Sequence, residues 1–271
     1  MKPAPFDYVR AESLAEAHDV LAAEGGDAAV IAGGQSLVPL LSMRMARPKV
    51  LIDIMHIAEL DGIAMDNNTI RVSARVRQAE LLAWPDLAVR QPLLAQAMPW
   101  IGHWQTRSRG TVCGSIALAD PSAELPLCLL ALGGEVTLSS KQGRRSVEAG
   151  DFFTGLMSTA RRDDELIEQV SFPCRRPGEG FAFREFARRH GDFAIVACAA
   201  VATEKSVQLA VSGVADRPVV RDFDDASDAA LAAFASELDT RDDLHATAEY
   251  RRMLVRELGR QTIEEARRCR A

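Results

Sequence analysis

The residues best suited to bind a ligand lie in a glycine turn near the N-terminus. The apolar run 28–32 is followed by GGQS at 33–36, and apolar residues resume at Leu37. Successive N–H groups of such a turn can converge on phosphate oxygens, and glycine has no Cβ atom to keep the phosphate away. A helix beginning at Leu37 would add its N-terminal partial charge, and Ser36 a hydroxyl donor. Two glycines between a strand and a helix are, however, more often only a turn.

A second stretch, residues 109–126, has the composition of a ligand-lining segment. It reads RGTVCGSIALADPSAELP, with small residues and hydroxyls followed by Asp120 and Glu124. Such a segment can lie flat beneath an extended ligand, with its N–H and hydroxyl groups on phosphate and its carboxylates on sugar hydroxyls. By pattern alone, a tightly packed Gly/Ala helix segment is an equally good interpretation.

Several other chemistries lack their motifs. There is no GxGxxG, so a Rossmann dinucleotide site is not supported. The five histidines show no HExxH spacing, the five cysteines include no CxxC, and neither Ser36 nor Ser115 sits in a GxSxG elbow. We therefore expect no metal ligand in this chain, and the missing motifs agree with the absence of a catalytic residue that the family resemblance described below implies. The charged run 161–165 (RRDDE) predicts a solvated turn.

Composition limits the class of protein. The chain has 271 residues, 48% of them hydrophobic, enough for one large or two small domains. A net charge of −6 without any basic tract argues against nucleic-acid binding. No run approaches the ~18 apolar residues of a membrane span, and the N-terminus lacks a signal-type apolar segment. An odd number of cysteines indicates a reduced, cytoplasmic protein.

Short strands and helices alternate irregularly, which predicts an α+β fold rather than a doubly wound sheet. A capping box at 13–16 begins the first helix, which Gly25-Gly26 ends. Prolines, glycine and charges near 173–178 mark a domain boundary. We expect domains at 1–173 and 178–271, the second with a three-stranded antiparallel sheet. The three strands of that sheet are 181–186, 194–202 and 207–214. The other predicted strands are 28–32, 50–54, 69–74 and 135–138, and the predicted helices are 78–83, 93–101, 125–132, 227–236 and 249–268.

Together the two stretches resemble the FAD-binding medium subunit of the molybdenum hydroxylases, the family of the carbon monoxide, xanthine and N-heterocycle dehydrogenases. AGGQSL at 32–37 and TVCGSIALADPSAELP at 111–126 carry the resemblance. It extends over nearly the whole chain, through LIDI at 51–54, RRHGDFA at 188–194 and the closing helix from Glu249. The resemblance implies an FAD-binding domain of the PCMH (vanillyl-alcohol-oxidase-like) type, divided near 55–60, before a small C-terminal domain.

The resemblance also implies the residues that bind FAD. The glycine loop would hold the pyrophosphate and one face of the flavin, and the second motif would hold the phosphates and the ribityl chain. Ile167 and Phe193 would lie near the flavin or adenine edge. The residues implied are Ala32, Gly33, Gly34, Gln35, Ser36, Leu37, Thr111, Gly114, Ser115, Asp120, Glu124, Ile167 and Phe193.

Four positions depart from the family pattern. Where relatives often read TxGGN, this chain has Cys113 for a glycine and Ser115 for an asparagine. Some relatives carry tyrosine where this chain has Phe193, and some carry lysine where it has Glu185. Cys113 affects one amide contact with FAD, Phe193 lacks the hydroxyl of the tyrosine in those relatives, and Glu185 changes the charge near the flavin.

The function implied is electron transfer within a heterotrimer or a dimer of heterotrimers. A large molybdopterin subunit would hydroxylate a small organic substrate, such as an aromatic or N-heterocyclic compound, and a small subunit with two [2Fe–2S] clusters would carry the electrons. FAD on this chain would pass them to an external acceptor. Two alternatives stay open: a self-contained flavin-dependent oxidase or dehydrogenase, and a nucleotide-binding scaffold subunit without flavin chemistry.

Overall fold

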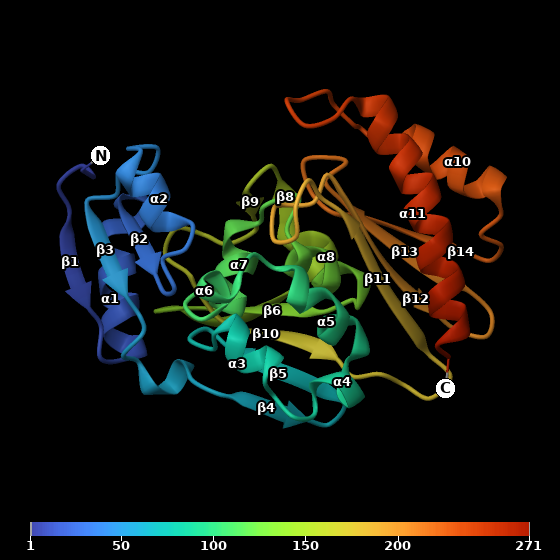
Figure 1. Ribbon diagram of the computed structural model, residues 1–271. Coiled ribbons are helices and arrows are strands. Elements are labelled where there is room, and N and C mark those ends of the chain that lie inside the picture. Colours follow the sequence, from blue (N-terminus) through green and yellow to red (C-terminus); the bar gives the residue numbers. More distant parts are fainter. Residues whose placement is uncertain (1, 271) are drawn as a thin grey trace.

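The computed structural model describes residues 2–270, which fold around three main sheets with helices between them (Figure 1). The strand orders are β1-β3-β2, β4-β5-β10-β6-β7 and β11-β12-β13-β14, and β8-β9 forms a small hairpin. Helices mixed with mainly antiparallel strands confirm the α+β class predicted from the sequence.

The three-stranded sheet is parallel, and helices make its crossovers. It contains β1 (Asp7–Arg10), β2 (Ala28–Ile31) and β3 (Val50–Asp53), joined through α1 (Leu14–Glu24), a 3₁₀ turn at Gly25–Asp27, and α2 (Leu37–Ser42). The hydroxyl of Ser13 accepts the Glu16 N–H and caps α1, as the capping box predicts. Because β2 and β3 run parallel to one another, their carboxyl ends lie at the same edge of the sheet.

The five-stranded sheet is antiparallel and has β10 in its middle, between β5 and β6. Its strands are β4 (Ile63–Asp66), β5 (Thr69–Ser73), β6 (Glu135–Ser140), β7 (Gly143–Glu148) and β10 (Leu166–Pro173). The segment between β5 and β6 supplies a layer of short helices. These are α3 (Gln78–Leu82), α4 (Leu87–Arg90), α5 (Pro92–Ala97), α6 (Trp104–Arg107), α7 (Val112–Leu118) and α8 (Glu124–Ala131). Smaller elements are the 3₁₀ turns Ala58–Leu60 and Met98–Trp100, α9 (Ala149–Phe152), β8 (Phe153–Gly155) and β9 (Ser158–Thr159).

The C-terminal sheet has four strands, so the predicted three-stranded sheet is wrong by one. Its strands are β11 (Gly180–Phe186), β12 (Val196–Ala202), β13 (Val207–Ser212) and β14 (Val219–Phe223), followed by α10 (Asp228–Glu237) and α11 (Ala248–Arg268). Residues 219–223 read VVRDF, which has no apolar alternation. β14 is an edge strand that pairs only with β13, and an edge strand does not need the pattern of a buried one.

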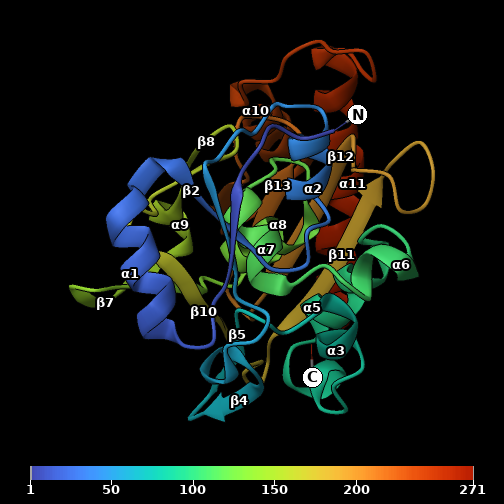
Figure 2. The ribbon, with the colours of Figure 1, turned by 90° about the vertical axis from the view of Figure 1, so that its left-hand side faces the viewer.

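The four-stranded sheet is covered on both faces. One face packs on α11, and the other packs on α5 and α8, through Phe181 and Phe183 among other residues. α8 is apolar on nearly all sides and is buried along most of its length, as expected of a helix enclosed by other elements. In both views α7 and α8 lie between the three-stranded and the four-stranded sheets (Figures 1 and 2). Among residues 2–270, none of the helices combines the length and the apolarity that crossing a bilayer requires.

Candidate functional site

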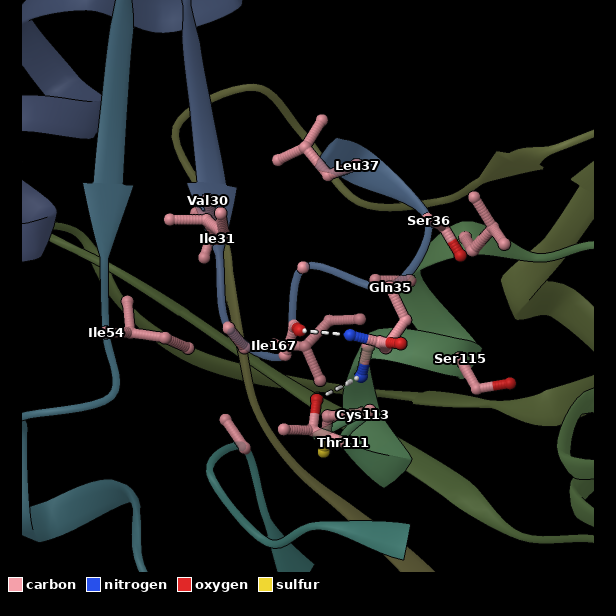
Figure 3. Close-up of a pocket in the computed structure, with 18 of the residues that line it drawn as sticks. Val30, Ile31, Gln35, Ser36, Leu37, Ile54, Thr111, Cys113, Ser115 and Ile167 are labelled. Carbon is pink, nitrogen blue, oxygen red and sulfur yellow. Dashed lines mark hydrogen bonds between the residues drawn. The ribbon is translucent and has the colours of Figure 1, made fainter. Parts of the chain in front are cut away.

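A cleft of about 370 Å³ opens where β2 and β3 end (Figure 3). One wall is the turn after β2 with Ile54 from the end of β3, and the other is the first turns of α7 with Ile167 of β10. Ligands of parallel α/β sheets commonly bind outside the carboxyl ends of the strands, and this volume suits a small molecule. The two stretches singled out from the sequence therefore face one another across a single cleft.

Glycine is needed at the two positions of the turn for different reasons. Gly34 has φ 69°, a left-handed conformation that side chains other than glycine rarely adopt. At Gly33 the reason is space, because a Cβ would lie 2.2 Å from the carbonyl oxygen of Arg109. The turn is thus packed directly on the backbone that leads into α7. The side-chain Nε2 of Gln35 also donates a hydrogen bond to the Gly33 carbonyl at 3.1 Å, which closes the turn on itself.

The turn presents backbone donors that the protein does not use. Within residues 2–270, the N–H groups of Gly34, Gln35 and Ser36 have no hydrogen-bond acceptor. Adjacent free N–H groups on a tight turn form a concave site for an anion, such as a phosphate. α2 begins at Leu37, as predicted.

The opposite wall is fixed by a helix cap. The hydroxyl of Thr111 accepts the Gly114 N–H at 3.0 Å and begins α7 (Figure 3). A Cβ on Gly114 would lie 2.7 Å from that same oxygen, so a side chain at this position would require the Thr111 hydroxyl to shift. The side chain of Cys113 is 3% exposed, and its Sγ lies 3.5 Å from the Val72 carbonyl of β5. Burial raises the pKa of this thiol to about 12, so Cys113 is a protonated packing residue.

Two carboxyl groups follow α7. Glu124, the first residue of α8, lines the cleft although only 4% of it is exposed. Burial, with a smaller contribution from the negative charge of Asp120, raises the pKa of Glu124 to about 7. Asp120 is not among the lining residues. Its Oδ1 accepts the Ser122 N–H at 2.9 Å, and burial raises its pKa above the ordinary value.

Phe193 reaches the cleft from the loop between β11 and β12 and is 59% exposed. This loop is held against the helical layer. Gly191, with φ 88°, would place a Cβ 2.8 Å from both the Gly102 carbonyl oxygen and the His103 ring, and the His190 ring packs edge-on against Trp100 at 5.1 Å. His190 and Gly191 thus hold the loop against the helical layer, and the loop places the Phe193 ring at the cleft.

The cleft brings together every predicted binding residue except Asp120. It also includes residues that the sequence analysis missed. Gln78 is 5% exposed, and its Oε1 is buried without a hydrogen-bond partner, facing Gly110. Arg161 and Glu165 line the cleft as well, and Glu165 is buried in an ion pair with Arg145. The predicted solvated turn at 161–165 is therefore wrong for Glu165.

These features define a class: proteins with a cleft for a phosphate-bearing nucleotide cofactor, built from a backbone anion cradle, a small-residue wall and a carboxylate. The chain belongs to the family described as the FAD binding domain in molybdopterin dehydrogenase, whose profile matches residues 4–175. This confirms the resemblance carried by the glycine turn and the second motif.

Relatives extend over the whole chain. The 6-hydroxypseudooxynicotine dehydrogenase complex subunit alpha of Paenarthrobacter nicotinovorans is 38% identical over 283 residues, which cover 98% of this chain and 96% of that protein. A carbon monoxide dehydrogenase structure from Hydrogenophaga pseudoflava matches with a TM-score of 0.94 at 31% identity, covering 100% of both chains. Quinoline 2-oxidoreductase from Pseudomonas putida 86 matches with a TM-score of 0.90 at 31% identity, covering 99% of both chains.

The residues present fit FAD. A pyrophosphate needs several N–H donors and no intruding side chain, which the free N–H groups of 34–36 and the close-packed glycines provide. The unpartnered Oε1 of Gln78 calls for a donor from a ligand or water. Glu124 offers an acceptor for a sugar or ribityl hydroxyl. Within residues 2–270, no group of three or more His, Cys, Asp or Glu side chains is placed to hold a metal ion.

Proposed function

We propose that this chain is the FAD-binding electron-transfer subunit of a molybdenum hydroxylase complex. The observation that carries the proposal is the single cleft formed by the two motifs, in a chain that matches its relatives from end to end. When bound, FAD accepts electrons and releases them to an acceptor, while the protein supplies position and electrostatics.

The residues around the cleft would have distinct tasks. The loop Ala32–Leu37 would hold the pyrophosphate through its free N–H groups and lie against one face of the flavin ring. Thr111, Gly114 and Ser115 would hold the phosphates and ribityl chain, with Glu124 accepting a hydroxyl. Asp120 would act through the loop that it caps at Ser122 rather than by lining the cleft. Ile167 and Phe193 would bound the flavin or adenine edge and exclude water from it.

The partners would be a large molybdopterin subunit and a small subunit with two [2Fe–2S] clusters, in a heterotrimer or a dimer of heterotrimers. Substrate hydroxylation would take place on the large subunit, so no acid, base or nucleophile of this chain is assigned a catalytic role. The names of the relatives, a 6-hydroxypseudooxynicotine dehydrogenase and a quinoline oxidoreductase, support a small aromatic or N-heterocyclic substrate for the complex.

We also propose the domain division and the cell compartment. A PCMH-type FAD-binding domain would occupy 1–173, in two parts divided near 55–60, and a C-terminal domain 178–271. The change from the three-stranded sheet to the five-stranded sheet after β3, and to the four-stranded sheet after β10, supports these limits. The free thiols of Cys113, Cys128, Cys174, Cys198 and Cys269 support a cytoplasmic location.

The test is a cofactor and subunit analysis of the full chain. A tagged chain isolated from its native cells should carry flavin absorption together with iron–sulfur absorption and two co-purifying subunits, and its extracted flavin should be FAD. The chain expressed alone should bind FAD. A chain that takes up no FAD, alone or with its partners, would refute the proposal. A yellow chain that oxidises a substrate by itself would favour a self-contained flavin enzyme.

A further inference from the structure

Gln78 carries a side-chain amide that the fold leaves unused. The residue is 5% exposed and lines the cleft, and its Oε1 is fully enclosed without a hydrogen bond. Within residues 2–270 its Nε2 has no hydrogen-bond partner either but, unlike Oε1, is not enclosed, so it is the accessible end of the amide. The start of α3 does not need this side chain, because the Glu80 carboxylate accepts the Arg77 N–H at 2.7 Å. An unpaired buried amide costs stability, so a ligand explains it better than the fold does.

The amide lies directly behind the glycine turn. A Cβ on Gly110 would lie 3.2 Å from the Oε1 of Gln78 and 3.1 Å from the Thr106 carbonyl oxygen, so glycine leaves the room that the amide occupies. The Cα of Gly110 is in turn 2.7 Å from the position of a Cβ on Gly33. The backbone N–H of Gln78 donates to the Gly110 carbonyl at 2.8 Å, which fixes the start of α3 beside this wall. Gln78 therefore reaches the cleft next to the turn that would hold the pyrophosphate.

The flavin ring belongs at the end of the cleft where Gln78 lies. Thr106, which lines this end, packs on Gly102, and the loop that carries Phe193 packs on the same glycine. Phe193 is 59% exposed, whereas Leu21, which lines the other end beside β2, is 1% exposed. A ring that exchanges electrons with other protein chains must lie at the accessible end. The adenine would then lie along β2, with the pyrophosphate between the two rings.

The chemistry of this end favours a hydrogen-bond donor. Ile101 and Phe193 contribute apolar surface to it, and Arg107 of α6 is engaged by the backbone, its Nη1 donating to the carbonyls of Ile101 and Gly102 at 2.7 and 3.1 Å. The pyrimidine part of a flavin carries oxygens and nitrogens that gain negative charge on reduction, and hydrogen bonds to such atoms tune the cofactor. A donor held in place where water is excluded favours developing negative charge.

We propose that the side-chain amide of Gln78 binds the flavin ring, donating a hydrogen bond from Nε2 to its pyrimidine edge and favouring reduced over oxidised FAD. The inference rests on the proposed function and adds to it a residue that sets the redox balance of the bound cofactor. The apo chain holds this donor in place at the expense of an unpaired Oε1. Removal of the amide should therefore weaken cofactor binding without destabilising the fold.

The first experiment compares FAD with ADP, which has the pyrophosphate and the adenine but no flavin, by titration of the full-length apo chain. In Gln78→Leu, Kd for FAD should rise about three- to tenfold because one hydrogen bond is lost, whereas Kd for ADP should change no more than about twofold. Equal losses of FAD and ADP affinity would mean that the residue only supports the turn, and would overturn the assignment.

Gln91→Leu is the matched control for every measurement. Gln91 is 1% exposed, its Nε2 donates to the Pro173 carbonyl at 2.6 Å, and it does not line the cleft. Its replacement should leave both affinities at the wild-type values.

The second experiment measures the midpoint potential of bound FAD, from the absorbance of the full chain during stepwise reduction. In Gln78→Leu, binding of reduced relative to oxidised FAD should weaken about tenfold, which lowers the potential by about 30 mV for a two-electron couple. Gln78→Glu keeps the shape of the side chain but replaces the donor by an oxygen, so its potential should fall at least as far, and it serves alone if Gln78→Leu does not fold. A wild-type potential in Gln78→Glu would show that the acceptor end of the amide faces the ring, which overturns the assignment.

Thermal unfolding of the apo chain separates a binding role from a structural one. Gln78→Leu removes an unpaired acceptor, so its melting temperature should not fall. Gln91→Leu breaks the hydrogen bond to the Pro173 carbonyl and should melt at a lower temperature than the wild type. A larger loss in Gln78→Leu than in Gln91→Leu would assign Gln78 to the fold.

The outcomes distinguish the two proposals. If the wild type takes up no FAD, the proposed function and this inference both fail. If it binds FAD, but Gln78→Leu and Gln78→Glu share its affinity and its potential, only the assignment of Gln78 is refuted.

Discussion

The carbonyl oxygen of Arg109 occupies the space that a side chain at Gly33 would need, 2.2 Å from the position of a Cβ atom. This contact fixes the glycine turn on the backbone before α7, so that the two walls of the cleft form one rigid unit. Shape here is decided by backbone atoms, which cannot move aside as a flexible side chain can.

Gly33→Ala should therefore weaken FAD binding. The methyl group forces the turn away from Arg109 and displaces the free N–H groups at 34–36, so Kd for FAD should rise about tenfold or more. Fluorescence titration of the full chain gives the measurement. The matched control is Gly150→Ala, where a Cβ meets no atom within 4 Å, and equal affinities of the two variants would contradict the prediction.

Thr111→Val should affect both stability and the cofactor. Loss of the hydroxyl that caps α7 should lower the free energy of unfolding by about 1 kcal/mol, and the loosened first turn should weaken FAD binding. Thr247→Val removes the equivalent cap of α11, whose hydroxyl accepts the Tyr250 N–H at 3.2 Å. Denaturant unfolding should show similar losses in both variants, but only the first should raise Kd for FAD. A parallel rise in both would mean that the effect is general destabilisation.

Glu165→Gln should destabilise the chain and flatten the acid side of its stability profile. Burial alone would raise the pKa of Glu165. Arg145 donates two hydrogen bonds to the carboxylate, at 2.6 and 2.8 Å, and the Arg162 N–H donates another. These bonds lower the pKa of Glu165 overall. The pKa of Glu165 is thus lower in the folded chain than in the unfolded chain. The ionised carboxylate therefore contributes fully to the free energy of unfolding at pH values above the unfolded-state pKa. This contribution is lost as the pH falls through the folded-state pKa. The loss at neutral pH should be about 1 to 3 kcal/mol.

Thermal unfolding of Glu165→Gln against pH is the measurement. Glu168→Gln is the control, because its partner Arg144 is largely exposed and the pair should contribute about 1 kcal/mol or less. Equal losses in the two variants would show that burial of Glu165 does not matter.

The apo chain should be less stable at alkaline pH. The folded pKa of Glu124, about 7, lies above its ordinary value of 4.5, so the folded chain binds more protons than the unfolded chain between these values. The free energy of unfolding therefore falls as pH rises through this window. The melting temperature should decrease from about pH 5 to about pH 8. Glu124→Gln should reduce this slope, whereas Glu204→Gln, which changes an exposed carboxyl group in a turn, should not. An unchanged slope in Glu124→Gln would argue against the burial of a titrating carboxyl group.

The sequence predicted the parts of the site that have local causes. The cap of α1 at Ser13 and the β2–turn–α2 unit depend on residues within a few positions of one another, so their patterns are visible in the chain. The helix α7 was not among the predicted helices. The sequence of β14 lacked the apolar alternation of a buried strand, because β14 lies at the edge of its sheet and has a neighbouring strand on one side only.

Residues whose role depends on distant partners were not visible. Glu165 looked like part of a solvated charge run, because its partner Arg145 lies 20 residues away across the sheet. Gln78 gave no signal in the sequence, since the burial of its unpartnered Oε1 beside Gly110 depends on a residue 32 positions away. The alternation of β11 could have shown that Glu185 faces the same way as Phe181 and Phe183, but not that α8 covers that face.

The position of β10 has a consequence for the order of folding. Ser73 of β5 pairs with Gln169 of β10, and Ile167 of that strand forms part of the cleft, so about 100 residues must leave the ribosome before the sheet can close. Until then β5 and β6 each present an open edge, and the ligand has only part of its walls. Cofactor loading is thus a late event in biogenesis, and a chain shortened before β10 would expose aggregation-prone strands rather than form a smaller flavin carrier.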